Sequence, residues 1–390
     1  MLFWLTLILS SPVQAWTCAT PANPALGQAV VQAAQGLSCP QGSQRRQVHM
    51  TFDDGPSSVS TPTILNELKR LNVPSTFFVS TAKIAATHPQ STAHRALVNR
   101  IMSDGHLLAN HGHDHDAYDV RMNAQGQLLS PGMTPEVREE QIRESTRLLN
   151  QATQNRFSQN QPYQWFRFPY GRGALPSDPE LDYMARRGMD FSAPDRATRL
   201  REYRRQSDAL GALSDSGYSH LLWNHDSMDS SYSTSTLTPS VMRDYIVGNL
   251  QRFCASGRPS LQVALFHDVK PFNAEAVPVL IEVARCMGVQ FVPASTVAQS
   301  QRLQESGTLI TAAQTQRAPV DVMGELIASL SGECPTCARP ERTPDTKSCL
   351  SEYNGQWYGH CQGGTVSICF EGQWKSRTDE WENRCRSEGL

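Results

Sequence analysis

The chain has no long hydrophobic run and no excess of charge of either sign. Its 390 residues carry 35 Lys and Arg against 37 Asp and Glu, a formal net charge of -2. No global positive field would therefore attract polyanions, and nucleic acid is not an expected partner. The one extended apolar run, residues 1–9, is far shorter than the roughly 20 residues that cross a bilayer. The sequence predicts no membrane span and, with 39% hydrophobic residues, favours folded domains.

The apolar run at the start of the sequence has the pattern of an export sequence. It is followed by a turn-prone Pro12 and by the small residues Val13 and Ala15. This pattern predicts a secretory signal peptide over residues 1–15, and hence a secreted or periplasmic protein. No Lys or Arg lies near Met1, which departs from the usual pattern; a misassigned start site or a buried first strand is the alternative reading.

Ten cysteines in an exported chain indicate disulfides. Pairing by sequence order predicts Cys18 with Cys39, Cys254 with Cys286, and bridges among the six cysteines crowded into residues 334–385. Cys334 and Cys337 are spaced as in a zinc knuckle, but an oxidising compartment favours a bridge.

Strand-like and helical segments alternate through the middle of the chain. Strands of four to six residues alternate with segments that have apolar residues at helical spacing, which predicts parallel strands joined by right-handed crossovers. So many units within about 250 residues favour a distorted (β/α) barrel, with an open doubly wound sheet as the alternative. The predicted strands are 47–52, 76–79, 106–109, 165–168, 189–192, 220–223, 261–266 and 289–292; the predicted helices begin at Pro62 and cover 134–150, 178–187, 240–254 and 274–286.

The extent of this alternating region and the composition of the segments on either side of it suggest the domain boundaries. Residues 16–46, rich in Ala, Gln, Gly and Pro, precede the alternating region, and residues 301–332 follow it as a linker. The remaining 333–390 form a Cys-rich module with too few aliphatic residues to fold without disulfides. We therefore expect a signal peptide (1–15), an N-terminal segment (16–46), an α/β domain (47–300), a linker (301–332) and a small C-terminal module (333–390).

Polar residues cluster immediately after the predicted strands, where the strand ends of a barrel converge on one mouth. Asp53 and Asp54 are adjacent carboxylates, which favours a nearby divalent cation to compensate their charge. His111 and His115, four residues apart, can reach one ion together with an aspartate, leaving positions open for water and substrate. His113 with His115 is an alternative ligand pair.

The remaining strand ends supply acid-base chemistry. Arg167 can hold a catalytic carboxylate in its ionised form. His267 can donate a proton if a carboxylate raises its pKa, and Asp226 is a candidate for that carboxylate. Each of these features is weak by itself, because lone polar residues at strand ends are often only structural.

The ordered set of motifs is more specific. TFDDGPS, NHGHDH, RFPYG, WNHDSMD and LFHD, in this order, resemble the motifs of the polysaccharide deacetylases of the NodB homology type, carbohydrate esterase family four. The resemblance covers roughly residues 47–300. The fourth motif departs from the family pattern, since Ser230 stands where the family usually has Trp, and this leaves the roles of Asp226 and Asp229 open.

The resemblance implies a metal-dependent hydrolase, usually with zinc, that removes acetyl groups from N-acetylglucosamine units. By this resemblance Asp54, His111 and His115 would bind the metal and Asp53 would be the general base. Arg167 would orient Asp53, His267 would be the general acid, and Asp226 would tune His267. A backbone N–H near Tyr170 would complete an oxyanion pocket.

The substrate is the least determined part. Tyr170 and Trp223, with Trp165 and Phe168, lie at the same strand ends and can stack on sugar rings or pack in the core. The expected partner is an N-acetylated glycan, most simply peptidoglycan; chitin or an exopolysaccharide is the alternative, because the motifs read the acetamido group and not the polymer. A further alternative is a wall-binding protein whose fold is that of an enzyme that has lost its activity. Loss of Asp53, a metal ligand or His267 would have favoured this alternative, and none of them is lost.

Overall fold

The computed structural model describes residues 23–123, 125–189, 195–233 and 235–305, and the backbone of 360–362, 365–370 and 373–377. The chain divides into two compact units. The first contains every candidate for metal binding and acid-base chemistry, and takes its described residues from 23–116, 134–171 and 208–305. In the described residues, no helix is long and apolar enough to cross a membrane.

The first unit is built on a parallel sheet whose path runs β7-β6-β3-β2-β1-β9-β8, with β10 added beside β1. All printed strand pairs of this sheet are parallel. In the described residues β7 and β8 do not pair, so the sheet is curled and open between them. The α/β class is confirmed, and the barrel is distorted as expected. The strands are β1 (Gln47–Asp53), β2 (Thr76–Val79), β3 (Leu107–Asn110), β6 (Trp165–Phe166), β7 (Ser219–His220), β8 (His225–Asp226), β9 (Leu261–His267) and β10 (Gln290–Phe291).

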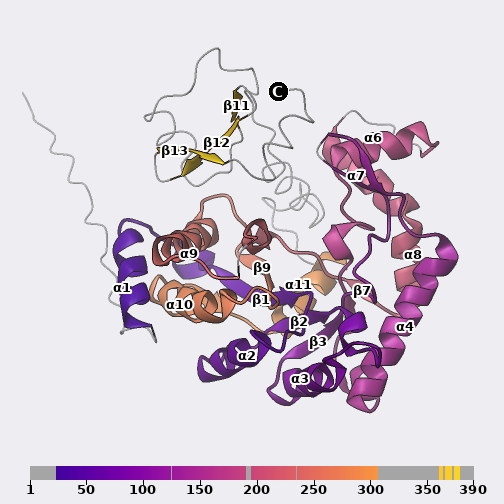
Figure 1. Ribbon diagram of the computed structural model, residues 1–390, viewed down its shortest axis with the longest axis horizontal. Helices are drawn as coiled ribbons and strands as arrows, with labels where there is room; N and C mark the ends of the chain where they lie inside the picture. Colours follow the sequence, from indigo (N-terminus) through magenta and orange to yellow (C-terminus); the bar gives the residue numbers. More distant parts are fainter. Residues whose placement is uncertain are drawn as a thin grey trace, which may run out of the picture. The chain divides into compact units, whose positions relative to one another are not determined.

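A row of helices covers the outside of this sheet (Figure 1). Along the row α9 packs on α10, α10 on α2, α2 on α3, α3 on α4 and α4 on α8, in the same order as the strands that they connect. The helices of the first unit are α1 (Pro24–Ala33), α2 (Thr61–Arg70), α3 (Ser91–Ser103), α4 (Pro135–Thr153), α5 (Arg156–Asn160), α8 (Asp208–Asp215), α9 (Pro239–Cys254), α10 (Asn273–Cys286) and α11 (Ala294–Glu305). Short 3-10 turns are η1 (Gly42–Gln44), η2 (Thr81–Ile84), η3 (Pro169–Gly171) and η4 (Asp229–Ser231).

Several helix starts follow directly from the sequence. Thr134 and Thr238 cap α4 and α9, each accepting a hydrogen bond from the backbone N–H three residues later, and a proline occupies the first position of both helices. The capping hydroxyl satisfies a backbone donor that would otherwise have no partner.

Strand β1 explains how polar groups come to lie inside the sheet. Successive side chains of a strand point to opposite faces, so His49, Thr51 and Asp53 share one face of β1. His49 Nε2 lies 2.8 Å from Thr76 Oγ1, and Thr51 donates to the Ala264 carbonyl at 2.8 Å. Burial lowers the pKa of His49 to about 4, so this imidazole is a neutral, hydrogen-bonded core group. The polar face ends at Asp53, which is the first candidate of the site.

An apolar cluster closes the other end of the curled sheet. It contains Phe78, Trp165 and Val263 from the strands together with Val297 and Ala298 from α11. Helix α11 runs to Glu305, beyond the residue 300 at which we place the end of the catalytic domain. The rest of the predicted linker lies outside the described residues, as does most of the predicted strand 189–192.

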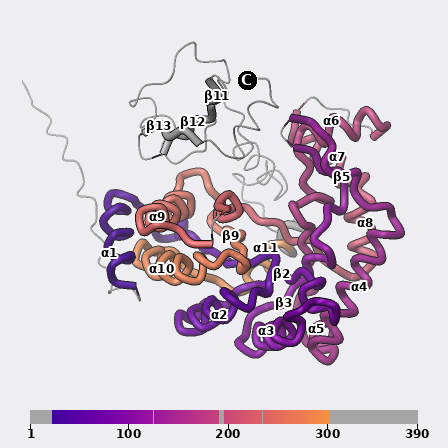
Figure 2. Tube along the Cα trace, viewed as in Figure 1, coloured from indigo at the N-terminus to yellow at the C-terminus, as the bar shows by residue number. Residues whose placement is uncertain are grey.

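The N-terminal segment is attached to the sheet domain. In Figure 2 α1 lies beside α9 and α10, which come from residues 239–286. Cys39 forms a disulfide with Cys254, and Cys286 is also disulfide-bonded. The predicted pairs Cys18–Cys39 and Cys254–Cys286 are therefore wrong. Pairing by sequence order fails because the fold brings the segment before β1 onto α9, 215 residues away in sequence.

The second unit includes two insertions, of which the sequence predicted only the helix at 178–187. One is the hairpin β4 (Arg121–Met122) with β5 (Leu128–Ser130), and the other contains α6 (Asp178–Arg186) and α7 (Arg196–Gln206). Its core joins Val120 and Met122 to Leu181, Met184, Leu200 and Tyr203. Near the C-terminus β11 (His360–Gln362), β12 (Thr365–Phe370) and β13 (Gln373–Arg377) form an antiparallel sheet. The predicted signal peptide and most of the Cys-rich module lie outside the described residues.

Candidate metal and acid-base site

Asp54, His111 and His115 converge at the carboxyl ends of β1 and β3. One ligand atom from each lies within 4.8 Å of the other two. Asp54 Oδ1 is 3.2 Å from His111 Nε2 and 2.8 Å from His115 Nε2. Burial raises the pKa of Asp54, but the adjacent imidazoles of His111 and His115 outweigh it and hold this pKa well below its usual value. The carboxylate is therefore ionised at neutral pH.

The donor set fits a divalent cation. His111 places Nδ1 2.7 Å from the Arg167 carbonyl; an N–H at Nδ1 donates to that oxygen and leaves the Nε2 lone pair facing Asp54. Two imidazole nitrogens and one carboxylate are a set that zinc accepts, with positions left for water and substrate. His113 does not join this set. Its Nδ1 lies 3.0 Å from Thr81 Oγ1 and its Nε2 3.4 Å from Asp114, on the other side of the loop.

The loop that carries the histidines is held by Asn110. Its side-chain oxygen accepts the Gly112 N–H at 2.8 Å, and its amide donates to Ser145 Oγ and Tyr218 Oη. These bonds tie the loop to α4 and to the segment before β7. The sequence analysis gave Asn110 no role. The available signal was its place as the first residue of the NHGHDH motif, directly before the candidate ligands, where an amide can orient the ligand loop.

Three residues of the site have backbone conformations that are rare for side chains other than glycine. Asp54, His115 and Tyr170 adopt φ values of 70, 60 and 57°. Such conformations cost free energy and persist where the surroundings determine them. Here they turn the ligand side chains inward from the strand ends, and they place the Tyr170 ring edge-on against His115, with 4.7 Å between ring centroids.

Asp53 and Arg167 form a buried ion pair next to the metal candidates. Arg167 Nη1 donates to Asp53 Oδ1 at 2.7 Å and to Thr51 Oγ1 at 2.8 Å, and its Nε donates to the Leu221 carbonyl. Arg167 is fully buried and Asp53 is 2% exposed. Burial lowers the pKa of the guanidinium, while Asp53 acts in the opposite direction. The pair leaves Asp53 Oδ2 directed toward His111, 3.8 Å from its Nε2.

His267 lies on the strand beside Asp53, as its register partner across β1 and β9. Its Nδ1 is 2.6 Å from Asp229 Oδ1, and its backbone N–H donates to Asp229 Oδ2 at 2.7 Å. Asn273 donates to the same Oδ2 at 2.6 Å. Burial alone lowers the pKa of His267, but the charge and hydrogen bond of Asp229 raise it to about 10. The imidazole is thus protonated at neutral pH, with Nε2 directed toward Asp54 at 3.9 Å.

The carboxylate on His267 is therefore Asp229 and not Asp226, which the family resemblance suggested while the choice between the two stayed open. After β8 the chain enters η4, whose first residue is Asp229, and this turn brings its buried side chain back to the end of β9. Asp226 instead accepts the Met228 N–H at 2.7 Å and interacts electrostatically with Arg167. Burial raises the pKa of the Asp226 carboxyl.

The aromatic candidates divide into two groups. Trp165 and Phe168 are buried in the core and offer no ring face to a sugar. Tyr170 is 41% exposed beside His115, and Trp223 is half-buried under the Arg167 guanidinium.

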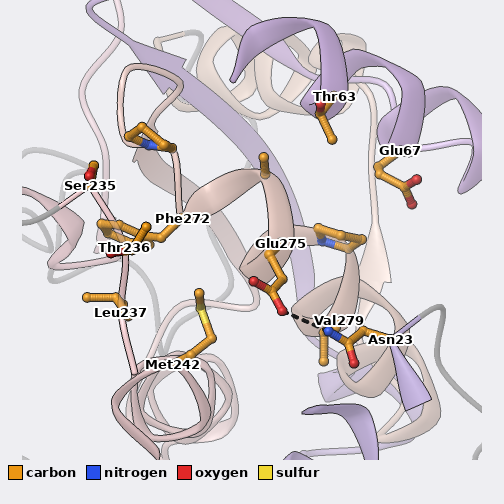
Figure 3. A pocket seen from close by; sticks show the side chains of 13 residues that line it. Asn23, Thr63, Glu67, Ser235, Thr236, Leu237, Met242, Phe272, Glu275 and Val279 are labelled. Carbon is orange, nitrogen blue, oxygen red and sulfur yellow. Dashed lines mark hydrogen bonds between the residues drawn. The ribbon is translucent and has the colours of Figure 1, made fainter. Parts of the chain in front are cut away.

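A separate cavity of about 520 Å³ lies among α2, α10 and residues 235–237. Figure 3 shows its lining, including the hydrogen bond from Asn23 to Glu275. No metal or acid-base candidate lines it.

Comparison with known proteins gives matches to polysaccharide deacetylases. Residues 40–191 match the family model for polysaccharide deacetylase. The chain is 38% identical over 76 residues to the peptidoglycan-N-acetylglucosamine deacetylase PgdA of Listeria monocytogenes, covering 20% of this chain and 15% of PgdA. It is 42% identical over 74 residues to a chitooligosaccharide deacetylase of Rhizobium leguminosarum bv. trifolii, covering 19% and 31%. The matches thus span less than a third of these relatives.

Among solved structures, the chain resembles the peptidoglycan deacetylase PdaC of Bacillus subtilis, with 20% identity and a TM-score of 0.42 over 68% of this chain and 96% of PdaC. The matched range 40–191 includes Asp53 and all three metal candidates, whereas Asp229 and His267 lie beyond residue 191. The chain therefore contains a polysaccharide deacetylase domain of the NodB type.

Proposed function

We propose that this protein is an exported, metal-dependent polysaccharide N-deacetylase that removes acetyl groups from N-acetylglucosamine residues of peptidoglycan. One observation carries the proposal: the Asp54, His111 and His115 cluster lies between a buried carboxylate, Asp53, and a protonated imidazole, His267. Amide hydrolysis needs a base for the attacking water and an acid for the departing amine. Asp53 Oδ2 lies 3.8 Å from His111 and His267 Nε2 lies 3.9 Å from Asp54, so both groups reach the same cation site.

The residues divide the reaction among them. A divalent cation, most simply zinc, held by Asp54, His111 and His115 would acidify a water molecule and polarise the acetyl carbonyl. Asp53 accepts the proton of the attacking water, with Arg167 orienting the carboxylate through its hydrogen bond to Oδ1. His267 then donates its proton to the nitrogen of the leaving sugar amine, and Asp229 stabilises the charged imidazole before transfer.

We propose peptidoglycan as the substrate because a peptidoglycan-N-acetylglucosamine deacetylase is among the matching relatives, with chitin as the competing substrate. The peptidoglycan-N-acetylglucosamine deacetylase PgdA matches over 76 residues, and the chitooligosaccharide deacetylase matches over 74. Acetate release measured side by side on peptidoglycan sacculi and on chitin oligomers decides between them. Higher kcat/KM on chitin oligomers would assign the protein to that substrate, and release from neither would refute the deacetylase proposal.

Removal of the metal should stop the reaction. We expect a chelator to abolish acetate release by the purified protein and stoichiometric zinc to restore it, because the cation supplies the activated water. His111→Ala should bind zinc at least about tenfold more weakly and should not recover, since the loss removes one of three protein ligands. Acetate release and zinc content are the measurements.

His113→Ala is the matched control for the same loop. Its side chain contacts Thr81 and Asp114 and not Asp54, so zinc content should match that of the unaltered protein. Loss of zinc in His113→Ala with retention in His111→Ala would show that the ligand assignment is wrong.

A further inference from the structure

Asp268 is a buried carboxylate at the site that the reaction scheme above leaves without a role. It follows His267 at the end of β9 and is fully buried. Its Oδ2 accepts a hydrogen bond from Thr61 Oγ1 at 2.5 Å. Its Oδ1 is buried with no hydrogen-bond partner in the described part of the chain. Burial of a carboxylate with one unpaired oxygen costs free energy of folding, which suggests that Asp268 has a role at this position.

Two hydroxyl groups from the segment after β1 bind this residue. Thr61 Oγ1 accepts the Ser57 N–H at 2.8 Å and passes its own hydrogen bond to the Asp268 carboxylate. Ser60 Oγ donates to the Asp268 backbone carbonyl in a close contact. Residues 57–61 are thus tied to the end of β9 through both the side chain and the backbone of Asp268.

The carboxylate also lies against the backbone of Gly55. A Cβ at Gly55 would come within 2.2 Å of both carboxylate oxygens, so glycine is needed here because Asp268 approaches so closely. The other side of the same turn is held by Ser80, whose N–H donates to the Gly55 carbonyl at 3.1 Å. The peptide after Asp54 is therefore held between the ends of β2 and β9.

We propose that Asp268 is a positioning residue, whose carboxylate braces the turn of residues 53–57 and fixes Asp53 and Asp54 relative to His267. The geometry suits this role, because Asp53 and His267 are register partners at the end of the β1–β9 pair and Asp268 is the next residue along. The identity of the reaction rests on the proposed function; the bracing of the metal-binding turn does not.

The brace acts through shape and hydrogen bonding more than through charge. Burial raises the pKa of Asp268 to about 7, against the opposing effects of the Thr61 hydrogen bond and Lys83. The Thr61 hydroxyl donates to Asp268 Oδ2, and this bond needs an acceptor oxygen and not a full negative charge. An asparagine has the same shape and keeps an acceptor for Thr61, so Asp268→Asn should preserve the brace, whereas Asp268→Ala should remove it.

The test uses Asp268→Asn, Asp268→Ala and Thr61→Val in the full chain. Groups that orient metal ligands typically contribute about 10-fold to 100-fold to metal affinity or activity. We expect Asp268→Ala and Thr61→Val to weaken zinc binding and to lower kcat by about tenfold with KM little changed. Asp268→Asn should stay within about threefold of the unaltered protein in both measurements.

Thr153→Val is the matched control for Thr61→Val. Thr153 is also buried, donates to the Leu149 carbonyl and accepts the Phe157 N–H at the end of α4, and it lies outside the site. The midpoints of thermal unfolding of Thr61→Val and Thr153→Val show how much stability each variant loses, so that the two can be compared. The control should lose stability without losing zinc affinity, measured by competition with a chromophoric chelator.

The outcomes are distinct. If Thr61→Val and Asp268→Ala keep the zinc affinity and kcat of the control, or if Asp268→Asn is as impaired as Asp268→Ala, the brace is refuted. If the unaltered protein releases no acetate while Thr61→Val still binds zinc more weakly than Thr153→Val, the proposed function fails and the brace stands.

Discussion

Asp53→Asn should abolish turnover while leaving zinc bound. The variant loses the group that accepts the proton of the attacking water, and loss of a general base typically costs about 10²–10⁴-fold in kcat. Zinc should remain, because the three ligand candidates are Asp54, His111 and His115. The change also removes the charge that faces the fully buried Arg167. Breaking a buried ion pair costs roughly 3–5 kcal/mol, so the free energy of unfolding should fall as well.

Glu180→Gln separates the two effects. Glu180 is fully buried and pairs with Arg172 at 2.8 Å in the second unit, so its loss tests the cost of a broken ion pair away from the site. It should lower the unfolding midpoint but leave kcat per folded molecule near that of the unaltered protein. Ordinary kcat in Asp53→Asn, with zinc bound, would show that Asp53 is not the base.

The strand-end residues could be predicted from sequence because their positions depend on a simple rule. In a parallel sheet the carboxyl ends of all strands lie at one edge, so a polar residue directly after a strand is placed by the strand alone. Asp53 at the end of β1, Asp54 after it, His111 after β3 and His267 at the end of β9 follow this rule. Their convergence needed only the strand boundaries and the α/β class.

Asp229 could not be chosen over Asp226 in the same way. The two carboxylates lie three residues apart in an irregular segment, where no periodicity fixes the direction of a side chain. The choice depends on η4 and on three groups at the end of β9 and the start of α10 that bind the Asp229 carboxylate. Those contacts come from residues 38 to 44 positions later in the chain.

Among the helices that the sequence analysis did not predict, α1 and α3 were missed for different reasons. Helix α1 has a readable start, since Asn23 accepts the Leu26 N–H and Pro24 follows it, but its Ala- and Gln-rich interior hid the buried pair Leu26 and Val30. Helix α3 begins without a side-chain cap, so only its buried Leu97, Val98 and Ile101 mark it. The hairpin and α7 of the second unit carry short or strongly charged sequences, whose structure depends on tertiary packing.

The last prediction concerns the proton donor and its pH dependence. His267→Ala should lower kcat by about 10²–10⁴-fold, the usual effect of losing a general acid. In the unaltered protein His267 must be protonated to act, and its pKa is raised to about 10. The rate should therefore persist through neutral pH and fall as pH rises through that value.

Asp229→Asn should move this alkaline limb to lower pH. It removes the charge and the strong hydrogen bond that raise the pKa of His267, while the burial that lowers this pKa remains. We expect a downward shift of at least about one pH unit and a lower kcat at neutral pH, measured as kcat from pH 6 to 11 with zinc saturating. Asp226→Asn is the comparison, because Asp226 bonds to the Met228 N–H and not to His267. A limb that moves with Asp226→Asn and stays in place with Asp229→Asn would return the tuning role to Asp226.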